Sequence, residues 1–251
     1  MDTDIDLSST GLTEEEREAV VAFCDALGER LGEELQSVSV YGSALTDAYT
    51  ENSDINLLVV LKRADLEVLK RLRAPVTDGR RLGIAPFFIT GSNLGTATQA
   101  FPVKFLAIKD NHHVLLGDDP LDDLDIDRDL LCLRCRQELV NILLRMRQYY
   151  LHRGGRDLTA HMANIAPVVL ENLRVAVSMG GGDMPSREGA IDLAAEGYGV
   201  DPRVLRDLAG LRRREVSLPP DESDALFDEV LSTVDRLVHA LDDEPCSTPK
   251  M

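Results

Sequence analysis

In the first half of the chain, stretches with apolar residues at helical spacing alternate with short apolar runs typical of strands. Apolar residues at helical spacing follow Thr13, and Thr13 and Glu16 have the spacing of a capping box, which predicts the start of a helix. Short apolar runs bounded by turn residues predict strands over 37–41, 55–61 and 84–90. Pro86 in the third run indicates a sheet edge or a bulge. Further helices are predicted over 64–73 and 92–100. The pattern over 105–116 is apolar with breaks and predicts no single element.

The second half of the chain has an almost purely helical pattern. A sustained apolar stripe at alternating spacings of three and four comprises Cys132, Cys135, Leu139, Ile142, Met146 and Tyr149. A second apolar face of the same helix comprises Leu133, Val140, Leu144 and Leu151. A helix that is apolar on two faces is expected inside a bundle, and Gly154 marks its end. Further helices are predicted over 157–179, 187–196, 202–214 and 221–241.

These patterns predict an α+β protein with two domains. Residues 1–125 are expected to form a mixed sheet with flanking helices, and residues 126–243 an all-α helical bundle. An acidic joint, GDDPLDDLDIDRD, separates the two, and residues 244–251 are expected to form a frayed tail. The chain of 251 residues is long enough for this arrangement.

Composition and charge limit the kinds of molecule that the protein is expected to bind. The net charge of −17 disfavours non-specific binding of nucleic acid. It suits a cationic substrate, and it equally describes an ordinary solvated acidic surface. The N-terminal segment lacks the basic and apolar regions of a signal peptide, and no apolar run approaches the length of a membrane span. With only four cysteines, the chain is expected to be cytoplasmic with free thiols.

The chemistry is concentrated in the stretch VSVYGSALTDAYTENSDINLLVVL, residues 38–61. Gly42 and Ser43 follow a predicted strand, where glycine allows close approach to a phosphate, and serine adds a hydroxyl. Asp54 opens the next strand, with Asn56 two residues further on. Side chains at such positions of a strand face the same way, so two oxygens are expected beside the glycine–serine turn. This arrangement could hold Mg²⁺ and a nucleoside triphosphate together.

The same residues carry a resemblance to a known family. Tyr41-Gly42-Ser43, the spacer and Asp54-Ile55-Asn56-Leu57 resemble the signature of the polymerase-β-like nucleotidyltransferase superfamily. The whole chain also resembles proteins that join such a domain to a C-terminal helical bundle, as the aminoglycoside and minimal nucleotidyltransferases do. The resemblance implies transfer of a nucleotide from an ATP-like triphosphate to a hydroxyl of a small-molecule or protein acceptor. The acceptor, the nucleotide and the oligomeric state stay open.

The resemblance also implies two Mg²⁺ ions held by three carboxylates, and here this chain departs from the pattern. Asp54 takes the first position and is the expected metal ligand, but Asn56 occupies the second position. The third carboxylate is expected on a later strand, and the run over 84–89 contains no acid. Asp118 or Asp119 is the alternative source. We therefore expect Asp54 and Asn56 to form a catalytic centre of weak or absent activity. The alternative is an inactive member that binds a nucleotide or a protein.

Three other clusters are assigned structural roles from the sequence alone. Asp127 closes an acidic run that lacks the glycine and glutamate of a calcium loop, and it is expected to cap the long helix. Cys132 and Cys135 lie on the apolar stripe of that helix, so core packing is favoured over zinc or redox chemistry. His112 and His113 have no visible partner ligands and are expected at a strand end or on the surface.

Overall fold

A computed structural model describes residues 5–46, 49–50, 53–179, 184–211 and 218–243. The chain divides into two compact units, residues 1–126 and residues 127–251. The first unit contains α1 (Glu14–Leu31), β1 (Leu35–Tyr41), β2 (Ile55–Leu61), α2 (Leu66–Arg81), β3 (Ile84–Thr90), α3 (Gly91–Ala100), α4 (Pro102–Asp110) and β4 (His112–Gly117). Short 3₁₀ turns at Gly32–Glu34 and Gly42–Leu45 flank β1. This α+β unit confirms the predicted fold class.

The first unit is built on a mixed four-stranded sheet in the order β3-β2-β1-β4. β1 is antiparallel to both of its neighbours, whereas β2 and β3 are parallel. β3 lies at the edge of the sheet, as Pro86 indicated, because a proline cannot donate to a second neighbouring strand.

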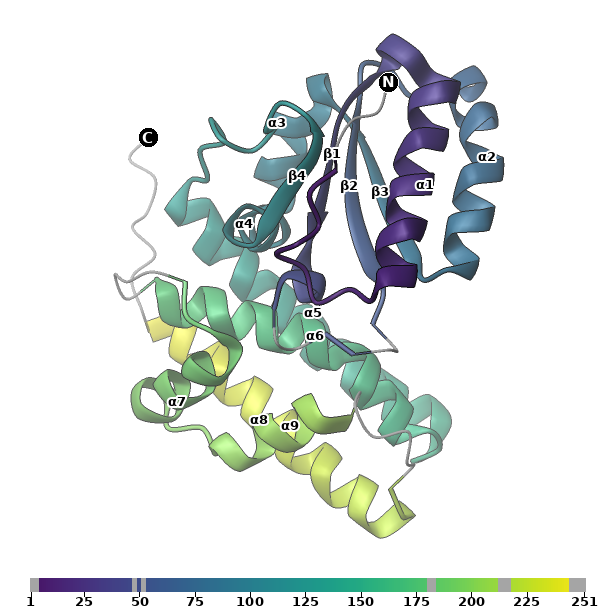
Figure 1. Cartoon of the computed structure of the whole chain (residues 1–251). Coiled ribbons are helices and arrows are strands. Elements are labelled where there is room, and N and C mark those ends of the chain that lie inside the picture. The colour runs from purple at the N-terminus through teal and green to yellow at the C-terminus, as the bar shows by residue number, and fades with distance from the viewer. Residues whose placement is uncertain (1–4, 47–48, 51–52, 180–183, 212–217, 244–251) are drawn as a thin grey trace. The chain divides into compact units, whose positions relative to one another are not determined.

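Two pairs of helices cover the two faces of this sheet (Figure 1). Alternate residues of β2 separate cleanly: Leu57 and Val59 pack against α1 and α2, whereas Leu58 and Val60 pack against α3 and α4. β1 alternates less cleanly, because Ser37 and Ser39 are buried and their hydroxyls find no hydrogen-bond partner among the described residues. The central strands are therefore covered on both faces, which is why β2 reads as one continuous apolar run.

Two features of the first unit differ from the sequence-based expectation. The helix predicted to end at residue 73 continues to Arg81, and Pro75 is accommodated within it on the buried face. The ambiguous run 105–116 holds the end of α4 and all of β4 except its last residue, so helical and strand periods meet within it. The capping box of α1 is confirmed: the Glu16 amide donates to Thr13 Oγ1 at 3.3 Å, and the Thr13 amide donates to Glu16 Oε2 at 2.7 Å.

The described residues of the second unit form helices joined by turns, with no strand among them. The unit contains α5 (Arg128–Arg153), α6 (Leu158–Ser178), α7 (Arg187–Tyr198), α8 (Pro202–Leu211) and α9 (Pro220–Asp243). Asp127 caps α5, as predicted, by accepting a hydrogen bond from the Leu130 amide at 2.7 Å. The predicted stripe of α5 is buried from Cys132 to Met146 and packs against α6 and α9. The predicted tail 244–251 lies outside the described residues.

Two expectations for the second unit are wrong. The second apolar face of α5 is not buried: Leu133, Leu144 and Leu151 are 53%, 52% and 81% exposed, because α6 and α9 cover only the stripe. The cysteines are not all free, since Cys132 is disulfide-bonded while Cys135 and Cys24 are buried free thiols. No helix within the described ranges is long and apolar enough to cross a membrane.

Candidate functional site

The predicted phosphate turn is a single 3₁₀ turn at the end of β1. Gly42 has a φ of +81°, a left-handed conformation that glycine adopts at little cost. The Thr46 amide donates to the Ser43 carbonyl at 2.9 Å and closes the turn. A Cβ atom added at Gly42 would lie 3.7 Å from Asn56 Nδ2, so the turn and Asn56 are neighbours. The structure thus brings together two of the predicted site residues from β1 and β2.

Asn111, which the sequence analysis did not single out, fastens this turn to the loop between α4 and β4. Asn111 Nδ2 donates to the Gly42 carbonyl at 2.9 Å, and the Gly42 amide donates to the Asn111 carbonyl at 3.1 Å. Both the backbone amide and the backbone carbonyl of Gly42 are therefore hydrogen-bonded to one residue that lies far away in sequence. An asparagine in a loop gives no sequence signal of this role.

Asp54 and Asn56 lie at the same end of the sheet. Asn56 pairs with Tyr41 across β1 and β2, and its Nδ2 donates to the Asp54 carbonyl at 3.4 Å. Asp54 is exposed and precedes β2.

Burial raises the pKa of Tyr49 well above its ordinary value. Glu16, which accepts a hydrogen bond from the Tyr49 hydroxyl at 2.7 Å, and the negative charge of Asp54 raise this pKa further. The Asp54 carboxylate is therefore in electrostatic reach of the Tyr49 phenol.

The third strand lies directly beside β2. In the parallel register Asn56 pairs with Ala85, and Leu58 pairs with Phe87. Lys104 of α4 places its ammonium group 3.5 Å from the centre of the Phe87 ring, and burial lowers the pKa of this lysine. β3 thus carries the methyl group of Ala85 and the ring of Phe87 beside β2, at positions where the family resemblance implies the third metal-binding carboxylate.

The residues present do not fit a pair of metal ions. Asp54 supplies a carboxylate and Asn56 a neutral amide oxygen, whereas a two-ion clamp needs carboxylates that bridge the ions. Within the described ranges, no three His, Cys, Asp or Glu side chains lie close enough to share a metal ion.

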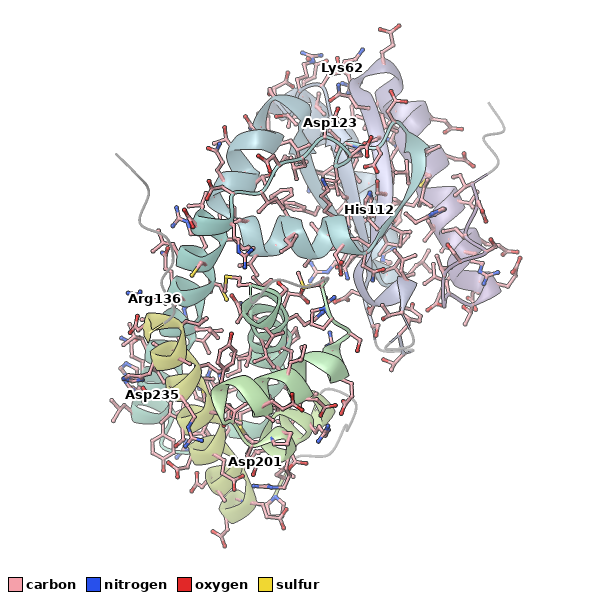
Figure 2. The ribbon with its side chains drawn as sticks, turned by 90° about the vertical axis from the view of Figure 1, so that its left-hand side faces the viewer. Lys62, His112, Asp123, Arg136, Asp201 and Asp235 are labelled. Atoms are coloured by element: carbon pink, nitrogen blue, oxygen red, sulfur yellow. The ribbon has the colours of Figure 1, made fainter. Side chains whose placement is uncertain are left out.

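Asp119, the alternative acid, is engaged with His112. His112 opens β4 and is labelled in Figure 2. His112 Nε2 lies 3.0 Å from Asp119 Oδ2, and its Nδ1 lies 3.0 Å from the Lys109 carbonyl. Both ring nitrogens therefore lie within hydrogen-bond distance of an oxygen atom. His112 stands at a strand end, as predicted, but its side chain is only 13% exposed and is not a surface group.

The pKa of Asp119 makes one contribution to stability depend on pH. Partial burial alone would raise this pKa, but the hydrogen bond from the Leu121 amide and the interaction with His112 outweigh burial and lower it. The charged form therefore stabilises the fold fully above the ordinary value of 3.8, and the contribution is lost as the pH falls through the lowered pKa.

Asp119→Asn is expected to lower the free energy of unfolding by about 1 kcal/mol at pH 7, a modest value because the site is partly solvated. The difference from the parent should shrink as the pH falls below 3.8. Urea unfolding across this range measures both effects. Asp118→Asn, at the exposed neighbouring position, is the control and should change stability little. A constant difference at all pH values would contradict the assignment.

The comparisons with known proteins bear on the fold. No family model matches the chain, and no curated protein sequence matches it. Among solved structures a match with a TM-score of 0.61 covers 92% of this chain and 100% of the other. The chain therefore has the fold of a nucleotidyltransferase with a helical C-terminal region, which confirms the predicted resemblance at the level of fold. The matched structure is spectinomycin adenyltransferase AAD(9) from Enterococcus faecialis with ATP and spectinomycin, which is 14% identical in sequence.

Proposed function

We propose that this protein binds a nucleoside triphosphate at the Gly42–Ser43 turn and Asp54, and that it transfers the nucleotide slowly or not at all. One observation carries the second half of the proposal: β3 runs parallel beside β2 and pairs Ala85 with Asn56. A neutral amide and a methyl group thus stand where two carboxylates would hold ions. Each missing carboxylate charge beside a divalent ion removes several kcal/mol of electrostatic interaction energy. A loss of that size in the transition state corresponds to orders of magnitude in rate.

The binding half of the proposal rests on the geometry of the turn. Gly42 lacks a side chain and has a left-handed backbone conformation, so a phosphate can approach the turn and the Ser43 hydroxyl closely. Asp54 stands at the same end of the sheet and would hold the Mg²⁺ that accompanies a triphosphate, with weak affinity for the ion alone. The fold neighbour was solved with ATP, which supports an ATP-like ligand. We also propose that the protein is located in the cytoplasm.

Active transfer to a hydroxyl acceptor is the second candidate function. The fold neighbour, a spectinomycin adenyltransferase solved with both ATP and spectinomycin, favours it. Under this alternative a small molecule or a protein side chain would accept the nucleotide, and the net charge of −17 would suit a cationic acceptor.

Calorimetric titration with ATP, with and without Mg²⁺, tests the proposal when it is paired with an assay for pyrophosphate release. We expect ATP to bind in the presence of Mg²⁺ with little release, and Asp54→Ala to weaken binding. Robust Mg²⁺-dependent release that Asp54→Ala abolishes would establish the second candidate instead. If ATP does not bind to the parent protein at all, both candidates are refuted.

Asn111→Ala is expected to weaken ATP binding by about three- to tenfold, because it removes one hydrogen bond that holds the phosphate turn. The Gly42 amide keeps its bond to the backbone carbonyl of residue 111, so the fold should persist. Calorimetry measures the affinity, and circular dichroism checks the fold. Asn164→Ala, at an exposed position of α6, is the control. An unchanged affinity in Asn111→Ala would show that the tether does not position the turn.

A further inference from the structure

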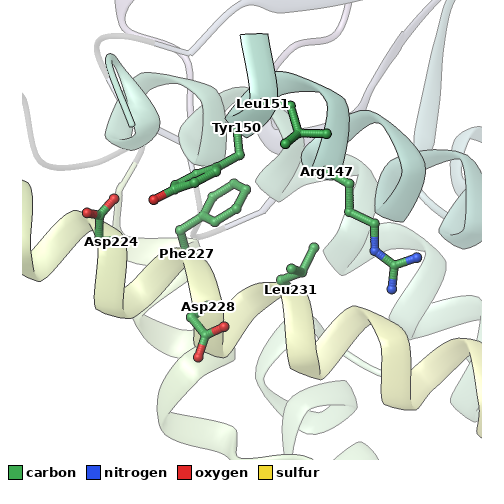
Figure 3. Close-up of a pocket in the computed structure, with 7 residues that line it drawn as sticks. All are labelled: Arg147, Tyr150, Leu151, Asp224, Phe227, Asp228 and Leu231. Atoms are coloured by element: carbon green, nitrogen blue, oxygen red, sulfur yellow. The ribbon is translucent and has the colours of Figure 1, made fainter. Parts of the chain in front are cut away.

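The helical unit has a groove of its own between α5 and α9, with a volume of about 500 Å³ (Figure 3). α5 contributes Arg147, Tyr150 and Leu151, and α9 contributes Asp224, Phe227, Asp228 and Leu231. The volume lies within the range of small-molecule sites, and it is too small for a protein helix with its side chains.

The floor of the groove is apolar and partly aromatic. The Tyr150 and Phe227 rings stack with their centroids 5.5 Å apart. Leu151 at the rim is 81% exposed, so a large apolar side chain stands uncovered beside the rings. Arg147 donates to Asp235 at 3.0 Å, which engages its charged end and leaves its aliphatic stem to line the groove. A flat or aliphatic body would bury this surface on binding.

The α9 side of the groove is negatively charged. Asp224 and Asp228 are one helical turn apart, both exposed, and neither forms an ion pair or a hydrogen bond with any other described residue. Two like charges at this spacing repel each other, and a bound cation would relieve the repulsion. Arg147, which also lines the groove, is already engaged with Asp235, so these carboxylates are left for a ligand.

We propose that this groove is a binding site for a small amphiphilic cation, an amine whose apolar body lies on the Tyr150–Phe227 stack and whose ammonium group meets Asp224 and Asp228. A second copy of this chain is a poorer occupant, because it brings a net charge of −17 to an acidic rim. The proposal concerns the helical unit and does not depend on nucleotide binding in the first unit.

Tryptamine is a suitable probe, because it joins a flat aromatic ring to an ammonium group. The chain contains no tryptophan, so indole fluorescence polarisation reports the probe alone. We expect saturable binding at about 1 mM or below. Tryptophol, its neutral alcohol counterpart, should bind about tenfold more weakly because it lacks the charge. Added salt should weaken tryptamine binding more than tryptophol binding.

Variants with matched controls locate the site. Asp224→Asn combined with Asp228→Asn should weaken tryptamine binding by about tenfold. Glu196→Gln combined with Glu222→Gln makes the same change in net charge at exposed positions outside the groove, and it should leave the affinity within about twofold.

The apolar floor is tested by a pair of exposed leucines on α5. Leu151→Ser should weaken binding by about threefold to tenfold, whereas Leu144→Ser, 52% exposed and outside the groove, should not. Three results would overturn the proposal: no saturable tryptamine binding, equal binding of tryptophol and tryptamine, or equal effects of the two double carboxylate variants.

Discussion

Asn56→Asp is expected to make nucleotide binding far more dependent on Mg²⁺, by about a hundredfold when binding with Mg²⁺ is compared with binding in a chelator. With Mg²⁺ present, a second carboxylate beside Asp54 would attract the ion, and ATP should bind about tenfold more tightly. Without Mg²⁺, the same carboxylate would repel the triphosphate, and ATP should bind about tenfold more weakly. Calorimetric titration under the two conditions measures both changes.

Two further variants make this result specific. Asp54→Asn removes a charge from the same site and should change the Mg²⁺ dependence in the opposite direction. Asn164→Asp adds the same charge at an exposed position of α6 and should leave the dependence unaltered. If Asn56→Asp altered affinity equally with and without Mg²⁺, Asn56 would not stand at the position of a metal ligand.

Gly117→Ala is expected to cause the largest loss of stability, about 3 kcal/mol or more. Gly117 ends β4 with a φ of +76°, and a Cβ atom there would lie 2.0 Å from the Gln36 carbonyl oxygen. The obstacle is the backbone of β1 itself, where Ser37 pairs with Gly117, so no flexible side chain can move aside. The end of the β1–β4 ladder would have to open. Urea unfolding measures the loss.

Gly95→Ala is the matched control for this prediction. Gly95 lies within α3, and a Cβ atom added there meets nothing within 4 Å. Alanine should stabilise the helix at this position by up to about 1 kcal/mol, because glycine is a poor helix former. The two glycine substitutions should therefore move the unfolding midpoint in opposite directions. A Gly117→Ala protein as stable as the parent would contradict the described β1–β4 register.

The elements with one clear period were predictable from the sequence. The capping box fixed the start of α1, and the continuous apolar run of β2 reflects a strand covered on both faces. Prediction failed where tertiary packing decides. Pro75 is tolerated inside α2, and β4 follows α4 so closely that the two periods merge. Leu151 lies on an apolar helical face that the bundle leaves open, which spacing alone does not reveal.

The candidate site likewise combines residues that the sequence suggests with a contact that only the tertiary structure reveals. The turn residue Gly42, Asp54 and Asn56 were predicted because their chemistry is encoded within one short stretch. Asn111 was not singled out, since its role arises from hydrogen bonds to Gly42, a residue distant in sequence. The register that sets Ala85 beside Asn56 depends on a parallel pairing, and parallel strands need a crossover whose alignment no local pattern specifies.

The central position of β1 has a consequence for synthesis of the chain on the ribosome. β1 can pair with β2 soon after both are synthesised, but its other edge stays unpaired until β4 and Asn111 have been synthesised. An unpaired strand edge can pair with a strand of another chain, which leads to aggregation. Ser37 and Ser39 lower the hydrophobicity of β1, although the finished fold buries their hydroxyls without a hydrogen-bond partner in the described part of the chain. Valine at both positions would suit the folded core better and would make the nascent chain more prone to aggregate.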